Sequence, residues 1–487
     1  MGYVKIATAH PFSGAPKINL ASVFGASPNK PFLLRIPVTG ARPLVYGAEN
    51  LPDGLVLENN VITGKVPAEG DYKITLTAEN ALGKAKKEIT LEIHPGNVLV
   101  TPLLGFTTWN AFGSEVTQTD VEKIAQKLVE LGITEYGYRY VNLDSGWQHE
   151  YGGEFDAVMP NGKFPDLKKM TDRIHALGLK AGIYSTPMLT AWGCPKEFDS
   201  IPGCTAGAPD PRFTSENGGI GIVRKERENA LQWNAWGFDY LKYDWKPTDP
   251  YNAELMRREL IRLDRDFGYC VTIRALKEYH EYWSSYVSSY RSCPDTHREW
   301  PNLIKIYRSY FDFMPYVKKG HYPDLDLLDL GTCRCEAVRG SFTEDEAVCA
   351  FSVRAFLGSP IQISSTLEHL DAFELSLYCN EEILAINQDS AFHTALPVYR
   401  VEKDDSLLDV FEKQLEDGSF AYAVFNMGET RQTVLGRFAD KANLRDVWAK
   451  EDLEQSAYLD LDLMPHAAFI LKADQKLEKL ASASHDT

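Results

Sequence analysis

Apolar residues recur at two different spacings along the chain, and the spacing predicts which parts form sheets and which form helices. Within residues 1–96 they alternate with polar residues, over 74–78 and again over 89–93. A period of two is typical of a half-exposed β-strand. The turn-forming stretch 80–83 lies between these two runs. Residues 1–96 are therefore predicted to form an all-β module, similar to a β-sandwich.

Between residues 97 and 394 the apolar spacing is that of helices, each followed by a glycine and an apolar strand. DVEKIAQKLVELG (120–132), for example, precedes the strand YRYVNLDS, and the same order occurs four times. Such alternation is typical of a parallel sheet. An open doubly wound sheet would alternate in the same way, but no G-x-G-x-x-G follows the first strand. We expect an eight-stranded β/α barrel, a TIM barrel, over 97–394.

The last part of the chain returns to the strand pattern. Two apolar runs flank Glu416 to Gly418, which predicts a hairpin, while the terminal residues 479–487 suggest a frayed tail. The predicted fold is multidomain: the N-terminal β module, the central TIM barrel, and an antiparallel β domain over 395–487.

Composition narrows the classes of partner. The chain has 487 residues and a formal net charge of −17, which argues against binding to nucleic acid or to an anionic membrane. No apolar run approaches the roughly 20 residues of a membrane helix. The first residues lack the layout of a secretory signal. This favours a cytoplasmic protein, or a secreted or periplasmic one whose signal is missing from this sequence. The oligomeric state stays open, with a homo-oligomer among the alternatives.

The cysteines suggest neither a metal site nor a redox motif. Eight are scattered along the chain without any C-x-x-C pair, so most are expected to be buried thiols. Cys194 and Cys204 are the pair that best fits a disulfide. We expect no metal and no cofactor.

The strand FDYLKYDW (238–245) carries two opposite charges. Lys242 and Asp244 are two residues apart, so both point to the same face of the strand. A nearby ammonium keeps a carboxylate ionised, and an ionised, positioned carboxylate suits a nucleophile. The alternative is a structural ion pair inside the barrel.

A second acidic candidate, Asp295, follows in YRSCPDTHREW, just after a strand expected over 286–291. It lies 51 residues after Asp244 (295 − 244), or two strands further along the barrel. Two carboxyl groups close together at the barrel mouth are what retaining glycoside hydrolysis requires, one to attack and one to donate a proton. The alternative for Asp295 is the N-cap of a helix that begins in this stretch.

Seven stretches resemble, in the same order, the motifs of glycoside hydrolase family 27, which contains α-galactosidases and α-N-acetylgalactosaminidases. They are GFTTWNAFG, VNLDSGW, GIYSTP, FDYLKYDW, YRSCPD, PDLDLLDLG and NEEILAINQD, spread over about 105–389. The stretch 51–80 is similar to immunoglobulin-like modules of bacterial proteins. The resemblance implies a carbohydrate substrate and a reaction in two displacements, with Asp244 as nucleophile and Asp295 as acid/base. By the same resemblance, the substrate-binding residues are Trp109, Asp144, Ser145, Tyr184, Lys242, Arg291 and Asp326, with Arg291 and Asp326 forming an ion pair.

Two departures from the family pattern leave the sugar open. The family's second strand ends in two adjacent aspartates, where this chain has Asp144 and Ser145. Its fifth strand has a Cys-Glu/Asn-Trp run, where this chain has Arg274 and Lys277. These cations suggest an acidic or differently substituted sugar, unless they only neutralise neighbouring carboxylates.

The sequence thus predicts an α-galactosidase-like exo-glycosidase with a retaining mechanism. One alternative keeps the mechanism with another substrate: a β-L-arabinopyranoside, an α-N-acetylgalactosaminide or an α-1,6-glucan. The other alternative is a non-catalytic, sugar-binding pseudoenzyme.

Overall fold

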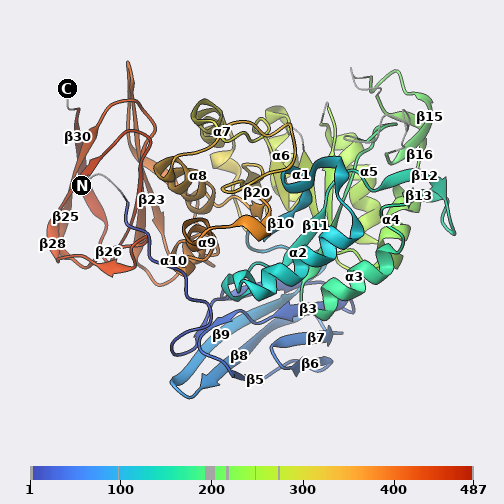
Figure 1. Ribbon diagram of the computed structural model, residues 1–487, viewed down its shortest axis with the longest axis horizontal. Helices are drawn as coiled ribbons and strands as arrows, with labels where there is room; N and C mark the ends of the chain where they lie inside the picture. The colour runs from blue at the N-terminus through green and yellow to red at the C-terminus, as the bar shows by residue number, and fades with distance from the viewer. Residues whose placement is uncertain are drawn as a thin grey trace.

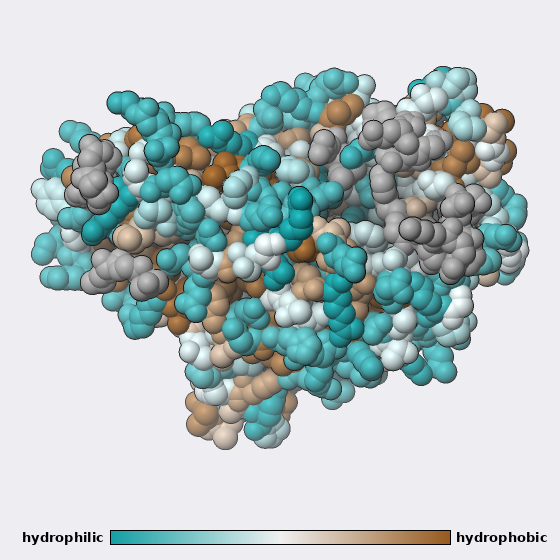
Figure 2. Space-filling model, turned by 45° about the horizontal axis from the view of Figure 1, so that its top comes forward, coloured by the Kyte–Doolittle hydropathy of each residue, from teal (hydrophilic) through white to brown (hydrophobic). Residues whose placement is uncertain are grey.

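The computed structural model describes residues 4–96, 98–191, 203–214, 219–246, 248–272 and 275–484. In Figure 1 a parallel barrel fills the centre, with a small β module below it and a second β domain at the left. Hydrophilic residues cover most of the face shown in Figure 2, with small hydrophobic patches between them. Within the described ranges, no helix is long and apolar enough to cross a membrane.

The central part is built on eight parallel strands that curl in the order β20-β19-β18-β17-β14-β11-β10-β21. A parallel bridge from Leu328, which follows β20, to Ile363 of β21 joins the two ends of the sheet. This arrangement is consistent with the predicted TIM barrel. The strands are β10 (Leu104–Thr107), β11 (Tyr140–Leu143), β14 (Lys180–Ser185), β17 (Tyr240–Asp244), β18 (Gly268–Thr272), β19 (Ser289–Arg291), β20 (Tyr322–Asp324) and β21 (Ile361–Ile363).

Helices alternate with these strands and cover the outside of the sheet (Figure 1). They are α1 (Thr108–Phe112), α2 (Gln118–Glu130), α3 (Leu167–Ala176), α4 (Glu226–Trp236), α5 (Pro250–Ile261), α6 (His280–Tyr286), α7 (Trp300–Phe313), α8 (Glu344–Phe356), α9 (Ala372–Tyr378) and α10 (Glu381–Asn387). Two hairpins extend the loops at the carboxyl ends of the strands: β12 (Gln148–Gly152) with β13 (Ala157–Pro160), and β15 (Thr205–Pro209) with β16 (Gly221–Arg224).

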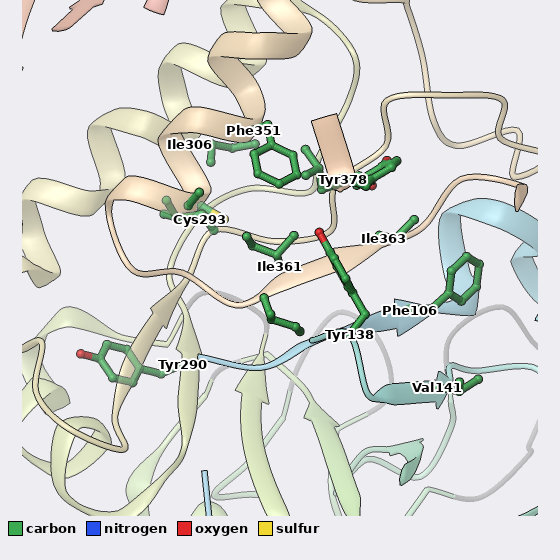
Figure 3. Close-up of a cluster of buried hydrophobic side chains, with 14 of the residues drawn as sticks. Phe106, Tyr138, Val141, Tyr290, Cys293, Ile306, Phe351, Ile361, Ile363 and Tyr378 are labelled. Atoms are coloured by element: carbon green, nitrogen blue, oxygen red, sulfur yellow. The ribbon is translucent and has the colours of Figure 1, made fainter. Parts of the chain in front are cut away.

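One large hydrophobic core fills the space between the sheet and its helices. Figure 3 shows part of it, where Tyr138 lies beside Ile361 and Ile363 of β21, below Phe351 of α8. This packing fixes the strand ends from which the functional side chains project.

The N-terminal residues form three small sheets around a core of their own, one of them the two-stranded pair β1-β4. The other two have the orders β2-β9-β8-β5 and β3-β7-β6, so the segment is all-β as predicted. That it is immunoglobulin-like stays a prediction. The strands are β1 (Lys17–Ile18), β2 (Val23–Ala26), β3 (Pro31–Arg35), β4 (Val38–Thr39), β5 (Val45–Glu49), β6 (Leu55–Glu58), β7 (Val61–Lys65), β8 (Gly70–Asn80) and β9 (Gly83–Ile93).

The C-terminal residues form two antiparallel sheets packed face to face, one of six strands and one of three. The predicted hairpin at Glu416 to Gly418 joins β23 to β24. The strands are β22 (Leu396–Lys403), β23 (Ser406–Gln414), β24 (Phe420–Asn426), β25 (Gln432–Ala442), β26 (Leu444–Asp446), β27 (Glu451–Asp452), β28 (Ser456–Leu463), β29 (Ala468–Ala473) and β30 (Leu477–Ser484).

Two local predictions were wrong. The strand expected over 286–291 begins only at Ser289, because Tyr286 ends helix α6. The expected frayed tail is ordered as far as Ser484, where β30 pairs with β25. The boundaries between the three parts stay predictions, although the change from strands to barrel falls between Ile93 and Leu104.

Candidate active site

A cavity of about 200 Å³ opens at the carboxyl ends of the barrel strands. Eight of the nine predicted site residues line it; Ser145 does not. The lining comprises Trp109, Asn110, Asp144, Tyr184, Lys242, Asp244, Lys246, Arg291, Asp295, Thr296, His297, Asp326, Leu327, Ala337 and Val338. Seven of these fifteen residues are charged, and two aromatic and three aliphatic residues supply the apolar surface.

The two charges of β17 both point into this cavity, as strand alternation requires. The ammonium of Lys242 lies 2.7 Å from Asp144, which directly follows β11. Asp244 ends β17, is only 9% exposed, and accepts a hydrogen bond of 3.1 Å from the hydroxyl of Tyr184. Its second oxygen, Oδ1, has no hydrogen-bond partner among the described residues. That oxygen is therefore the free end of the carboxylate.

The surroundings of Asp244 act on its pKa in opposite directions. Burial raises the pKa of Asp244 to about 6, although Lys242 and Arg291 act in the opposite direction. Lys242 thus favours the ionised carboxylate, as expected, while desolvation of the carboxylate acts against it and is the larger effect. Lys242 itself stays charged: burial opposes its charge, but the carboxylates of Asp144 and Asp244 raise its pKa.

Across the cavity, Arg291 at the end of β19 binds two carboxylates. Its guanidinium forms an ion pair with Asp295 and lies 3.3 Å from Asp326, the ion pair that the sequence predicted. Asp295 is 65% exposed at its side chain, whereas Arg291 and Asp326 are buried. Desolvation would raise the pKa of Asp295, but Arg291 outweighs it and lowers that pKa. The helix-cap alternative for Asp295 was wrong, because the next helix begins at Trp300 with Glu299 as its N-cap.

Asp326 is held in an unusual backbone conformation. Its backbone angle φ is +66°, a value that residues other than glycine rarely adopt. The surroundings fix it from both ends: its backbone N–H donates to Asp324 at 2.8 Å, and its side chain accepts from the N–H of Thr296 at 2.7 Å. Such a conformation persists only where the surrounding structure imposes it, and it is frequent at functional sites.

The two predicted aromatic residues lie on neighbouring elements. Trp109 is half-buried in α1, directly after β10. Tyr184 is buried in β14, with the ammonium of Lys242 5.7 Å from its ring centre. Both line the cavity, and Tyr184 contacts the two charged groups of β17.

Several predictions concern residues elsewhere. Ser145 is fully buried, with its hydroxyl 3.5 Å from Gln148. Lys277 forms an ion pair with Asp312 and does not line the cavity. Arg274 lies outside the described residues.

The structure tests the predictions about the cysteines only in part. Cys194 also lies outside the described residues, so the disulfide stays a prediction, and the thiol of Cys204 is buried and 3.3 Å from Ser185. Cys270, Cys293, Cys349 and Cys379 are buried thiols, as expected, whereas Cys333 and Cys335 are half-buried.

Sequence reasoning missed other cavity residues, among them Asn110 and Lys246. The amide of Asn110 donates to Asp329 at 2.6 Å, and burial raises the pKa of Asp329 to about 7. Lys246 follows Asp244 by two positions, so the alternation that drew attention to Lys242 and Asp244 would also have found it. Asn110 and Asp329 both lie in stretches that resemble family motifs, but only the fold shows that they contact each other.

The sequence is similar to those of known α-galactosidases. The family described as "Alpha galactosidase A" matches residues 101–205, and the "Alpha galactosidase C-terminal beta sandwich domain" matches 405–473. Alpha-galactosidase A of Cellvibrio japonicus is 25% identical over 405 residues, covering 76% of this chain and 91% of that protein. Alpha-galactosidase 2 of Arabidopsis thaliana is 25% identical over 364 residues, covering 72% and 83%.

A solved structure is also similar over nearly the whole chain. It is a candidate α-galactosidase/melibiase from Bacteroides fragilis, with a TM-score of 0.83 and 27% identity. The match covers 95% of this chain and 98% of the other.

With the barrel and its cluster of carboxylates, these matches indicate a glycoside hydrolase that acts on O-glycosyl bonds. More narrowly, the proteins that the chain is similar to are α-galactosidases.

Proposed function

We propose that the protein is an exo-acting, α-galactosidase-like glycosidase that retains the anomeric configuration. The observation that carries this proposal is the free Oδ1 of Asp244, buried in the cavity that Asp295 also lines. Retaining hydrolysis needs two carboxyl groups in one small site, one to attack and one to transfer protons. The small volume of the cavity favours a single terminal sugar ring.

In the first displacement, an oxygen of Asp244 attacks the anomeric carbon while Asp295 gives its proton to the glycosidic oxygen. The C–O bond to the leaving group breaks, and a covalent glycosyl-enzyme forms. In the second displacement, Asp295 takes a proton from water as the water oxygen attacks the same carbon, and the ester bond to Asp244 breaks. The sugar leaves as a hemiacetal, and both aspartates return to their starting states.

The neighbouring residues have supporting roles in this scheme. Lys242 with Asp144, and Arg291 with Asp326, form two rigid ion pairs that offer hydrogen bonds to the sugar hydroxyls. Tyr184 donates to Asp244 and orients the carboxylate for attack. Trp109 covers an apolar face of the ring.

One observation favours a second candidate substrate, a β-L-arabinopyranoside. By family resemblance, two adjacent aspartates at the end of this strand bind the 4- and 6-hydroxyls of galactose, and Ser145 replaces the second aspartate and its contact. Here Ser145 is buried and does not line the cavity, so that contact is missing. β-L-Arabinopyranose has the ring of galactose without its hydroxymethyl group, and a site lacking the 6-hydroxyl contact would accept it.

Hydrolysis of 4-nitrophenyl α-D-galactopyranoside and 4-nitrophenyl β-L-arabinopyranoside tests both candidates. The wild type is expected to hydrolyse at least one of them, and Asp244→Ala to lose several orders of magnitude in kcat. Turnover of the arabinoside alone would select the second candidate. If calorimetry shows that the wild type binds these sugars but the assay shows no hydrolysis, the proposed catalytic activity is contradicted and a pseudoenzyme is indicated.

A further inference from the structure

The cavity holds a lysine that the proposed mechanism does not use. Lys246 follows β17, lines the cavity and is half-buried. The other two cations of the cavity, Lys242 and Arg291, both form ion pairs. Over the part of the chain that the structure describes, Lys246 has neither an ion pair nor a side-chain hydrogen bond. A partly desolvated ammonium without a partner is costly, so a role in binding would explain why it is there.

The position of Lys246 relates it to the leaving group. Its charge is among those that lower the pKa of Asp295, so it lies near that carboxylate. His297, two residues after Asp295, also lines the cavity, and its Nδ1 has no hydrogen-bond partner within the described ranges. Since Asp295 would protonate the leaving-group oxygen, Lys246 and His297 both belong to the side of the cavity that faces the leaving group.

We propose that Lys246 binds an anionic group on the leaving group, so that the preferred substrate is a glycoside of an acidic sugar or sugar acid. This inference rests on the proposed function, and it specifies the substrate class for the same site. A lysine ammonium is a compact point charge without a fixed geometric preference, so it suits a carboxylate or a phosphate equally.

The test compares three α-D-galactosides in which galactose is linked to O6 of an open-chain leaving group. The leaving groups are neutral glucitol, gluconate with a carboxylate at C1, and glucitol with a phosphate at C1. The wild type is expected to show a kcat/KM about tenfold higher for at least one anionic substrate than for the glucitol, the value of one charged hydrogen bond. The gluconate and the phosphate separate a sugar acid from a phosphorylated sugar. In Lys246→Gln the ratio is expected to fall to about one, whereas Lys246→Arg retains part of it.

Lys123→Gln, on the exposed face of α2, is the matched control and should keep the wild-type ratio. Equal kcat/KM for the three substrates in the wild type would overturn the inference. An equal loss of kcat/KM on all three substrates in Lys246→Gln would also overturn it, because Lys246 would then act on Asp295 and not on the substrate.

Failure of the proposed function would be visible separately, as no turnover of any of the three. Calorimetric titration of all three compounds, the phosphate included, then decides the inference. Tighter binding of the gluconate or the phosphate that is lost in Lys246→Gln supports it, and no difference between the compounds overturns it.

Discussion

At the scale of single residues, Asp244 and Asp295 have pKa values shifted in opposite directions. The reaction needs one proton on the pair, carried by Asp295 while Asp244 is ionised. Burial raises the pKa of Asp244 to about 6, and Arg291 holds the pKa of Asp295 below its ordinary value despite desolvation. In the free enzyme the single proton therefore resides mainly on Asp244, and substrate binding has to favour the other arrangement.

This assignment predicts the pH dependence of kcat/KM, which reports the free enzyme. Above pH 6 the pair loses its last proton, and below the pKa of Asp295 it gains a second one. We expect kcat/KM to be highest between these two pKa values and to fall about tenfold per pH unit above pH 6. Steady-state kinetics from pH 3 to 8 would check this, and an activity plateau up to pH 8 would contradict it.

Asp329 offers a second test at this scale, because burial raises its pKa to about 7. A raised pKa contributes stability below the unfolded value of 3.8, and that contribution is lost as the pH rises through 7. Asp329→Asn stays neutral and can keep the bond to Asn110 through its amide oxygen. We expect its unfolding temperature to exceed that of the wild type at pH 8 and to match it at pH 4, as measured by calorimetry. A lower unfolding temperature at pH 8 would show that the carboxylate is needed.

At the scale of elements, the site depends on pairing between strand ends. Strand β14 lies between β11 and β17, and Lys242 reaches across it to bind Asp144. Removing only one partner of a buried ion pair leaves an uncompensated charge, at a cost of about 3–5 kcal/mol.

Lys242→Met should therefore lower the free energy of unfolding and abolish activity. The double variant Lys242→Met/Asp144→Asn removes both charges, so it should regain most of the stability while remaining inactive. Denaturant unfolding and kinetics on the single and double variants would check this. If the double variant is as unstable as Lys242→Met, lost packing and not an unpaired charge is responsible.

At the scale of the whole molecule, buried contacts join each outer part to the barrel. Tyr307 of α7 binds Asp409 of β23, and the indole of Trp448 donates to Ser352 of α8 at 2.9 Å. On the other side, the buried carboxylate of Glu135 lies 2.9 Å from Arg35 of the N-terminal module. The three parts are thus expected to unfold in a coupled manner.

Glu135→Gln tests the junction with the N-terminal module. The variant leaves Arg35, which is only 13% exposed, without its counterion, so the module should loosen from the barrel. Hydrogen exchange is expected to speed up in residues 4–96, while the barrel strands keep their protection. Glu88→Gln removes an exposed ion pair with Lys73 and should change nothing measurable. Unchanged exchange in both variants would mean that this ion pair does not hold the module.

Local signals in the sequence predicted much of this organisation, and contacts between distant residues account for what it missed. The turn at Glu416 to Gly418, for example, joins β23 to β24 as its residues predict. The charge state of Asp244, by contrast, depends on burial by several strands. Likewise, the tail strand β30 forms only because β25 offers a partner.

The most direct test of the account is to trap the glycosyl-enzyme. Asp295→Ala should still be glycosylated by 4-nitrophenyl α-D-galactopyranoside, whose leaving group needs little protonation, but it cannot activate water efficiently. Mass spectrometry of the quenched, digested variant is predicted to show one added hexosyl group on the peptide that contains Asp244, and none in Asp244→Ala/Asp295→Ala. A hexosyl group on another residue, or free galactose released with inverted configuration, would contradict the assignment of Asp244 as the nucleophile.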